Sequence, residues 1–594
     1  MSNIRTTDPF SAKEIIGDNI QQLLDPSSDM RKSFFWRPDP KDKRKVEKFE
    51  QWNVFEYADK FLPAFGFYSY RDPDGEGWDY RLIQKKGRFV RIIGNLADSR
   101  TRTLVFRWTL ETLKYLTGTA CDLPDFNNLK RSLMNKQNLF DAWTLKFLPE
   151  LPEVESDDGT GKWSSVPQRP LRDNPEQAHL CFTNAVAVVR KGKEPTAIPY
   201  PALPAELFIW DAQVRPYPIT DEMLDEGAHG VWWDFMQNTA KEFRDGEWKV
   251  NLGMLKTLMT SYGYLLHDFS PPDQRKAVVL YDRTSGIREG GAGKSILLDG
   301  IDKVRPYHWI DGKRLEGEKR FIMEGYTEDR RVVVFSDILK DWKLEDYYNM
   351  ISDGFTVEGK GQPAFVIPKQ SAPKIAINTN YTIPAVTRSD RRRLHFVPIS
   401  QFYGVLSDST GKTPKDVHGG WLLDEYSWTS EDWSAFYVTC LHCLHQYLEE
   451  GLVPFDDTVL HDRQLLAAAG HDESLLEALT SFIKEVAQSG GECTRPMVLD
   501  VFDKDPNLER YADWKPQWKV RRFKDMAVGM GFQVNPGRER NQRVINGVTT
   551  DCYLLVKPDL MPADAAEEKE PPSPPAVKDG RFTGFLFGET EEDA

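Results

Sequence analysis

The chain has 594 residues, of which 40% are hydrophobic and 28% charged, and its formal net charge is −14. This length suffices for three or four domains, while the acidic balance excludes a uniformly basic nucleic-acid coat and six cysteines exclude a disulfide framework. No run approaches about eighteen apolar residues and no signal-peptide pattern opens the chain, so we expect a cytoplasmic protein without a membrane partner.

The N-terminal third contains no recognisable catalytic motif. Residues 1–32 are polar and rich in turn formers, which predicts a flexible arm. Residues 33–218 alternate strand-like and helical runs and predict an α/β accessory domain. A primase centre needs two or three carboxylates converging on metal ions, but the acidic cluster of residues 72–79 contains proline and glycines and predicts a turn. We therefore favour an accessory or interaction domain. Residues 219–274 are expected to be mainly helical, since apolar residues recur there at helical spacing.

A glycine-rich segment after an apolar run has the composition of a phosphate-binding loop. Residues 277–281 predict a short strand, and a helical pattern follows Ser295. Small residues let backbone N–H groups approach a phosphate chain, Lys294 supplies a cation for the β- and γ-phosphates, and the hydroxyl of Ser295 suits Mg²⁺. The usual first glycine is replaced by Arg288. The predicted cofactors are ATP and Mg²⁺, and the predicted cofactor-binding residues are Gly290, Gly291, Ala292, Gly293, Lys294 and Ser295.

Two further strands carry polar residues at their ends. Residues 331–336 predict a buried parallel strand that leads into Asp337, where a carboxylate can hold the water shell of Mg²⁺. A core strand ended by a turn aspartate is the alternative. Residues 374–379 predict a third strand, after which Asn380 can orient an attacking water. Arg391 and Arg392 follow, and can reach the γ-phosphate held by a neighbouring subunit.

In this order, the motifs resemble those of superfamily 3 helicases of the AAA+ class, of the poxvirus- and phage-type primase-helicase kind found in viruses, plasmids and mobile elements. The resemblance covers residues 275–400 and implies an AAA+ P-loop ATPase core with a parallel sheet, over residues 275–465. It implies a ring-shaped homo-oligomer, expected to be a hexamer, that acts on single-stranded and forked DNA. The catalytic residues that it implies are Lys294, Asp337, Asn380, Arg391 and Arg392, with Ser295 and Asp337 at the metal and Arg393 as a possible substitute finger.

The chain departs from the family at motif B, where members commonly carry two adjacent acids. Ser336 occupies one of these positions, and the second carboxylate could come from Asp353 or Glu358. Charge within the matching segment is favourable for a DNA motor, because residues 275–400 carry 22 Lys and Arg against 17 Asp and Glu.

Between motif B, at Asp337, and motif C, which ends at Asn380, the family has a hairpin that grips single-stranded DNA. Here, two β-branched or aromatic runs flank residues 359–361, Gly-Lys-Gly, and predict such a hairpin. Lys360 at its tip could contact a phosphate and Phe365 a base or ribose face. A surface hairpin with a solvated lysine is the alternative.

Residues 471–557 predict a separate winged-helix-like module of three helices and a hairpin with a basic loop. The alternative is a structural or protein-binding module with solvated basic residues. The residues that we expect to contact DNA there are Lys519, Arg522, Arg538 and Arg540.

Residues 558–594 predict a disordered acidic tail that ends in an aromatic motif, Phe582–Phe587. Exposed aromatics beside acids suggest a short docking segment for a primase or a single-strand-binding protein, or a segment that folds back onto a basic channel.

These features together favour an ATP-dependent DNA helicase that acts in replication of a phage, plasmid or mobile element. Two alternatives remain open: a P-loop switch or loader ATPase that moves no DNA, and a DNA-binding initiator with weak or no ATPase activity.

Overall fold

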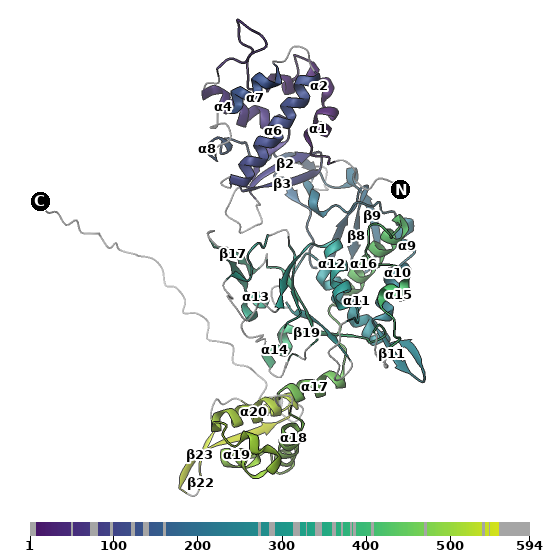
Figure 1. The fold of residues 1–594 in the computed structure, drawn as a ribbon, viewed down its shortest axis with the longest axis vertical. Helices are drawn as coiled ribbons and strands as arrows, with labels where there is room; N and C mark the ends of the chain where they lie inside the picture. Colours follow the sequence, from purple (N-terminus) through teal and green to yellow (C-terminus); the bar gives the residue numbers. More distant parts are fainter. Residues whose placement is uncertain are drawn as a thin grey trace, which may run out of the picture. The chain divides into compact units, whose positions relative to one another are not determined.

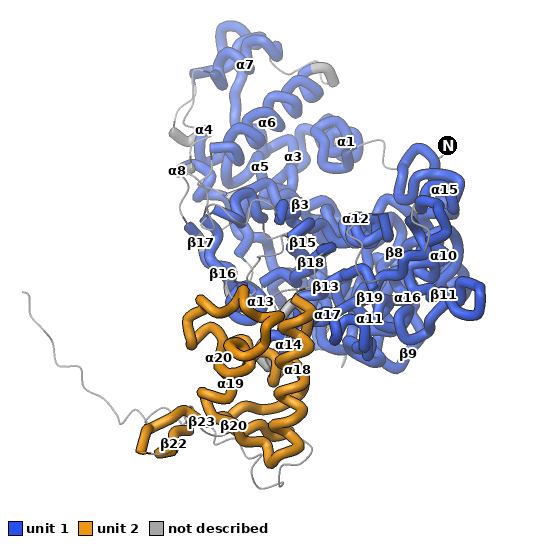
Figure 2. The backbone as a smooth tube through the Cα atoms, turned by 60° about the horizontal axis from the view of Figure 1, so that its bottom comes forward, with its two compact units in different colours: residues 1–464 blue, residues 465–594 orange. Residues whose placement is uncertain are grey.

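The computed structural model describes residues 8–48, 51–71, 81–95, 99–119, 125–134, 142–157, 162–270, 275–283, 291–312, 321–327, 330–338, 347–358, 364–369, 372–380, 383, 388–404, 409–468, 472–536, 541–545 and 547–557. The chain divides into two compact units, residues 1–464 and 465–594 (Figure 2). Within the described residues, no helix is both long and apolar enough to cross a membrane.

The centre of the first unit is a five-stranded parallel sheet with the order β14-β15-β18-β13-β19. Its strands are β13 (Ala277–Asp282), β14 (Tyr307–Asp311), β15 (Val332–Ser336), β18 (Lys374–Thr379) and β19 (Leu394–Ile399). The fold is therefore mixed α/β with a parallel sheet, as the sequence predicts at that level. The strand order places β18 between β13 and β15, so the ends of all three lie at one edge of the sheet.

Both faces of the sheet are covered, which explains why its strands are nearly continuous apolar runs. Alternate residues enter two cores: Val278 and Leu280 pack in one, Ala277 and Val279 in the other. The helices on the first face are α10 (Gly230–Asn238), α11 (Leu252–Leu266), α12 (Lys294–Val304) and α16 (Ser430–Glu450). The other face carries α13 (Tyr348–Ser352), α14 (Arg388–Arg393) and the hairpin β16 (Gly354–Val357) and β17 (Phe365–Pro368) (Figure 1).

The first core also includes residues that precede the helical segment. An antiparallel sheet of β7 (Gln177–Cys181), β8 (Ala185–Arg190) and β9 (Lys193–Pro199) contributes Ala178 and Leu180. The core thus runs across residue 218, where we expected one region to end and the next to begin. The smaller elements around it are η3 (Tyr200–Ala202), η4 (Asp211–Gln213), α9 (Asp221–Asp225), β11 (Lys241–Arg244), β12 (Glu247–Val250), α15 (Pro414–His418) and α17 (Thr458–Ala468).

The N-terminal part of the first unit has its own core, rich in aromatic residues such as Phe35, Tyr57 and Phe61. Its helices are α1 (Ala12–Asp18), α2 (Ile20–Leu24), α3 (Asp29–Lys32), α4 (Gln51–Glu56), η1 (Tyr57–Phe61), α5 (Leu62–Ala64), α6 (Ser99–Thr119), α7 (Phe126–Met134) and α8 (Ala142–Leu145). Its strands are β1 (Phe67–Tyr70), β2 (Arg81–Lys86), β3 (Phe89–Asn95), β4 (Val154–Asp157), β5 (Trp163–Val166), β6 (Arg169–Pro170) and β10 (Leu207–Trp210).

The second unit packs helices against a small sheet in which β23 pairs with β20, β21 and β22. Its helices are α18 (Glu473–Gln488), α19 (Arg495–Lys504), η9 (Pro506–Tyr511) and α20 (Pro516–Gly529). Its strands are β20 (Glu492–Thr494), β21 (Gln533–Val534), β22 (Gln542–Ile545) and β23 (Val548–Val556). The described part of this unit therefore contains three α-helices and a terminal hairpin.

Candidate nucleotide-binding site

The glycine-rich segment forms a tight turn into helix α12. Gly291 and Gly293 have φ angles of 117° and 100°, and Gly293 is the N-cap of the helix. A Cβ atom at Gly293 would lie 3.0 Å from the ring of Phe235, so both backbone conformation and packing require glycine there. The turn and the helix N-terminus present backbone N–H groups, which suits a phosphate. Gly290 lies outside the described residues, while Ala292 is buried in the core.

Lys294 is buried and binds two acceptors at the carboxyl edge of the sheet. Its Nζ atom lies 2.5 Å from Oδ2 of Asp282 and 2.9 Å from Oδ1 of Asn380. Asp282 ends β13 and Asn380 follows β18, and these neighbouring strands are parallel. The structure therefore brings Lys294 and Asn380 together, two residues that the sequence assigned to one site.

Asp282 was not among the site residues expected from the sequence. Its side chain is buried and its Oδ1 atom has no hydrogen-bond partner. The available signal was its position, since it is the last residue of the strand that precedes the glycine-rich turn. A buried carboxylate with one unsatisfied oxygen next to the lysine is a group whose partner is expected to change when a ligand arrives.

Ser295 is exposed, and its Oγ atom accepts a hydrogen bond of 3.1 Å from Nδ2 of Asn378. Asn378 is buried within β18 and its Oδ1 atom has no partner. Sequence reasoning missed this residue too, although a side-chain amide inside an apolar strand was a usable signal.

Asp337 lies at the same edge of the sheet, one residue beyond β15. The register places Ser336 opposite Asn378, so Asp337 leaves the sheet next to the Asn378–Ser295 contact. Its φ angle is 54°, a left-handed conformation that is uncommon for residues other than glycine. Asp337 is exposed and, within the described part of the chain, forms no hydrogen bond or ion pair with Lys294 or Ser295.

Oxygen donors at this edge suit Mg²⁺, which takes oxygen ligands and usually retains waters and phosphate oxygens. The hydroxyl of Ser295, the carboxylate of Asp337 and the unsatisfied Oδ1 of Asn378 are of the right type. A group of three or more His, Cys, Asp or Glu residues that could hold a metal is absent from the described residues. The arrangement fits a metal that is shared with bound phosphates better than one held by protein alone.

The predicted arginine fingers lie on helix α14. Arg392 is exposed, whereas for Arg391 the structure describes only its place in the helix. Arg393, the possible substitute, is held within its own chain: its Nε atom donates to Oγ of Ser352 at 3.0 Å and its guanidinium lies 4.4 Å from the ring centroid of Tyr348. Arg393 is thus poorly placed to reach another subunit.

The hairpin expected between motifs B and C is present as the antiparallel pair β16 and β17. Phe365 opens β17 opposite Val357. The tip, with Lys360, lies outside the described residues. Asp353 and Glu358, which could have replaced the missing motif-B acid, lie directly before and after β16.

In the second unit, one expectation is wrong. Lys519 does not face outward: its side chain is 4% exposed, and Nζ binds Oδ1 of Asp503 at 2.6 Å and the carbonyl of Ala512 at 3.1 Å. Arg522 is half-buried with its guanidinium 5.9 Å from the ring centroid of Trp514. Arg538 and Arg540 lie outside the described residues, as does the tail.

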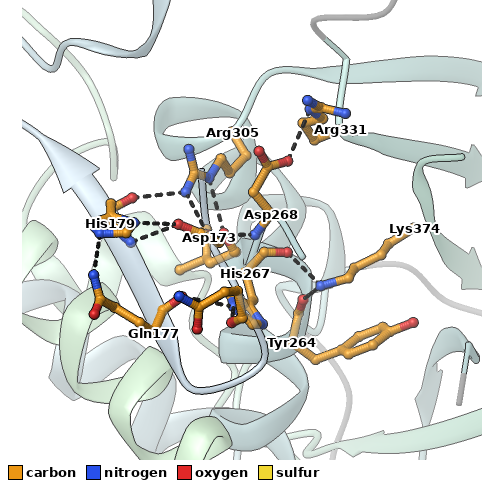
Figure 3. Close-up of polar contacts among 11 residues, drawn as sticks. Asp173, Gln177, His179, Tyr264, His267, Asp268, Arg305, Arg331 and Lys374 are labelled. Carbon is orange, nitrogen blue, oxygen red and sulfur yellow. Dashed lines mark hydrogen bonds and ion pairs between the residues drawn. The ribbon is translucent and has the colours of Figure 1, made fainter. Parts of the chain in front are cut away.

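A buried polar network joins the amino end of the five-stranded parallel sheet to segments that come earlier in the chain (Figure 3). Arg305, just after α12, donates to Oδ2 of Asp173 at 3.2 Å and to the carbonyl of His179 at 2.9 Å. Lys374, the first residue of β18, donates to the carbonyls of Tyr264 and His267. Asp173, Arg305 and Lys374 are buried, so their contacts specify how these segments pack.

Burial governs the protonation of this network. It lowers the pKa of Lys374 to about 7, although Asp268 and Asp173 oppose the shift. It also lowers the pKa of His267 to about 4, again against the influence of Asp173. For Asp173, burial favours the neutral form, but Arg305 and the hydrogen bond with His179 outweigh it and lower the pKa of the carboxyl.

Comparison with known proteins gives remote structural similarities. No protein-family model matches the sequence, and no curated protein matches it either. The C-terminal region of NrS-1 in its apo form is similar with a TM-score of 0.37 and 11% identity, over 84% of this chain and 98% of that one. A JCV helicase with a bound small molecule gives 0.18 and 14%, over 44% and 71%. An MCM homolog from Methanopyrus kandleri gives 0.20 and 9%, over 64% and 75%. At these TM-scores the assignment of function rests on the site itself.

Proposed function

We propose that the protein is an ATP-dependent DNA helicase of the superfamily 3 type, built on an AAA+ core and acting as a ring in the replication of a phage, plasmid or mobile element. The observation that carries the proposal is the position of Lys294. Its ammonium lies between Asp282 and Asn380 at the carboxyl edge of a parallel sheet, directly after a turn that only glycines allow. That edge is where open α/β sheets bind their ligands.

In this proposal, each residue of the site has a task set by its position. ATP phosphates lie on the N–H groups of the turn and of the α12 N-terminus, and Lys294 leaves Asp282 to neutralise the β- and γ-phosphates. Mg²⁺, when bound with ATP, draws charge from the phosphates, and the chain offers Ser295 and Asp337 to hold it. Asn380 orients the attacking water.

Asp282 supplies the second carboxylate that motif B lacks at Ser336. When the phosphates take Lys294, the carboxylate of Asp282 loses its cation and remains beside Asn380, facing the incoming phosphate group. A buried carboxylate without a counterion is a strong hydrogen-bond acceptor for water and can polarise it.

Arg392 is proposed to complete the site of a neighbouring subunit. It is exposed on α14, whereas Arg393 beside it is held by Ser352. A head-to-tail ring places such an arginine against the next subunit's ATP. Lys360 and Phe365 on the hairpin are proposed to grip single-stranded DNA, and the second unit to add contacts to duplex. We propose that the protein acts in the cytoplasm of the host cell, where such an element would be replicated.

The test combines ATP turnover with fork unwinding, each with and without single-stranded DNA. The helicase proposal predicts DNA-stimulated hydrolysis and strand separation, both abolished by Lys294→Ala. Hydrolysis without unwinding would favour a loader or switch ATPase and would refute the proposed helicase activity.

One observation favours a second candidate, a nucleotide-dependent switch that binds ATP with little turnover. Asp337 is exposed in a left-handed conformation and contacts neither Lys294 nor Ser295 within the described chain. Tight nucleotide binding with no turnover in the wild-type protein, under conditions that include DNA, would select this candidate.

A further inference from the structure

Exposed cations lie on two helices of the N-terminal part and on the turn beside them, and we call this region the basic surface. Helix α7 contacts α6, as the upper part of Figure 1 shows. The turn before α4 is tied to the start of α7, because the N–H of Asp125 and the side-chain amide of Asn128 both donate to the carbonyl of Arg44. The exposed cations of this surface are Lys43, Arg44, Arg107, Lys114, Lys130 and Arg131.

The salt bridges among the described residues include none of these six cations. Arg44 lies near Asp42, but the carboxylate of Asp42 pairs with Lys45. Other lysines and arginines of the same region are paired: Lys32 with Asp29, Lys60 with Glu56 and Lys86 with Asp18. The basic surface therefore leaves positive charge uncompensated in a chain of net charge −14.

Two of the acids near these cations have other contacts, whereas the carboxylate of Glu111 has none in the described part of the chain. Asp42 accepts from the backbone N–H of Arg44 and pairs with Lys45. Asp125 accepts from the N–H of Asn127 at the start of α7. Glu111, exposed on α6 one turn from both Arg107 and Lys114, is the acid that an anionic ligand would meet there. Helix α7 itself contains no acidic residue, so the charges of Lys130 and Arg131 are the least compensated on this surface.

We infer that this basic surface binds the phosphate backbone of DNA, in addition to the contacts proposed for the hairpin and the second unit. Several unpaired Lys and Arg side chains spaced over neighbouring elements match the repeated charges of a nucleic-acid backbone, and amide side chains such as that of Asn127 commonly join them. Because contacts with phosphates do not distinguish bases, we expect the binding to depend little on the DNA sequence. This surface would bind DNA independently of the mechanism by which ATP hydrolysis drives translocation.

The test is DNA affinity of the full chain without nucleotide, so that its outcome does not depend on ATP hydrolysis. The variant is Lys43→Ala, Arg44→Ala, Lys130→Ala and Arg131→Ala together, and the matched control is Lys32→Ala with Lys60→Ala, which removes cations that already have partners. Fluorescence anisotropy with labelled single-stranded and duplex DNA, at several salt concentrations, gives affinity and its salt dependence.

Each lost phosphate contact should reduce the slope of log affinity against log salt by about 0.9 on duplex and about 0.7 on single strands. At 50 mM salt this corresponds to a loss of about tenfold per duplex contact. The strand type with the larger change identifies the form of DNA that the surface holds.

The inference would be overturned if the variant with four alanine substitutions equalled the control, on both DNA types, in affinity and in the slope of log affinity against log salt. If affinity is lost, an equal loss in the corresponding glutamine variant, with an unchanged melting temperature in both variants, excludes misfolding as its cause. Loss of affinity confined to the control would overturn it equally.

Discussion

The contact between Lys294 and Asp282 makes a prediction about the nucleotide-free protein that is independent of any assay of activity. Both side chains are about 5% exposed, and Nζ of Lys294 is the donor to an otherwise unsatisfied carboxylate. Lys294→Met removes that donor and leaves a buried negative charge. Removing one partner of a buried pair costs about 3–5 kcal/mol, whereas replacing both is often nearly neutral.

The whole chain has two units, so a single unfolding free energy is not well defined and a local measurement is preferable. Amide hydrogen exchange of β13 and α12 reports their opening. A cost of about 3–5 kcal/mol corresponds to exchange that is faster by between about a hundredfold and a few thousandfold. Asp282→Asn combined with Lys294→Met should restore most of the protection, since no buried charge remains.

The control is Lys303→Met on the same helix. Lys303 lies 3.5 Å from Glu425 in an exposed pair, so its replacement should change protection by less than about 1 kcal/mol. Equal protection in Lys294→Met and Lys303→Met would refute the reasoning. So would a double variant that is no better protected than Lys294→Met alone.

Four further outcomes are expected. Asp282→Asn should reduce ATP turnover by on the order of a hundredfold or more while nucleotide affinity, measured with a fluorescent analogue, stays equal or increases; unchanged turnover would leave Asp282 with a structural role. Mixing Lys294→Ala subunits with Arg392→Ala subunits should restore ATPase activity above that of either alone, since each supplies what the other lacks, whereas an Arg393→Ala mixture should behave no differently from its components. Burial lowers the pKa of His267 to about 4, so between that pH and about 6.5 the unfolded chain binds one proton more and stability rises with pH; His267→Gln should flatten this rise by up to about 3 kcal/mol in pH-dependent unfolding of the first unit. A rise should remain in the variant, because burial also lowers the pKa of His395 to about 4 and lowers those of His308, His418 and His442. Lys519→Ala should destabilise the second unit by about 1–3 kcal/mol without changing DNA affinity, while Arg521→Ala on the exposed side of α20 should do the reverse; DNA affinity that follows Lys519 would contradict its buried position.

Strands β13, β15 and β18 of the parallel sheet could be predicted because burial on both faces makes such strands continuous apolar runs, whereas the partly exposed β14 lacks this pattern. Residues 277–281, for example, were expected as a strand and form most of β13. The hairpin β16–β17 was predictable for a related reason, since two β-branched runs flank a glycine-rich turn. Both the strand and the hairpin follow from local sequence patterns.

The residues that the sequence missed are those whose meaning depends on distant partners. Asp173 and Arg305 are 132 positions apart, and nothing near either indicates the other. Lys519 is instructive because its signal was local and was overlooked. It lies four residues before Phe523 and seven before Met526, both buried, so helical spacing places it on the inner face of α20.

The network around Arg305 and Lys374 determines where the chain can be truncated without loss of its buried contacts. A fragment that began at residue 219 would keep the nucleotide site but lose Asp173 and His179, the acceptors of Arg305. It would also expose Val278 and its neighbours, which share a core with Ala178 and Leu180. Such a fragment should aggregate, whereas one that begins near residue 162 retains these contacts. The smallest stable fragment that contains the glycine-rich turn is therefore expected to start more than a hundred residues before Gly290.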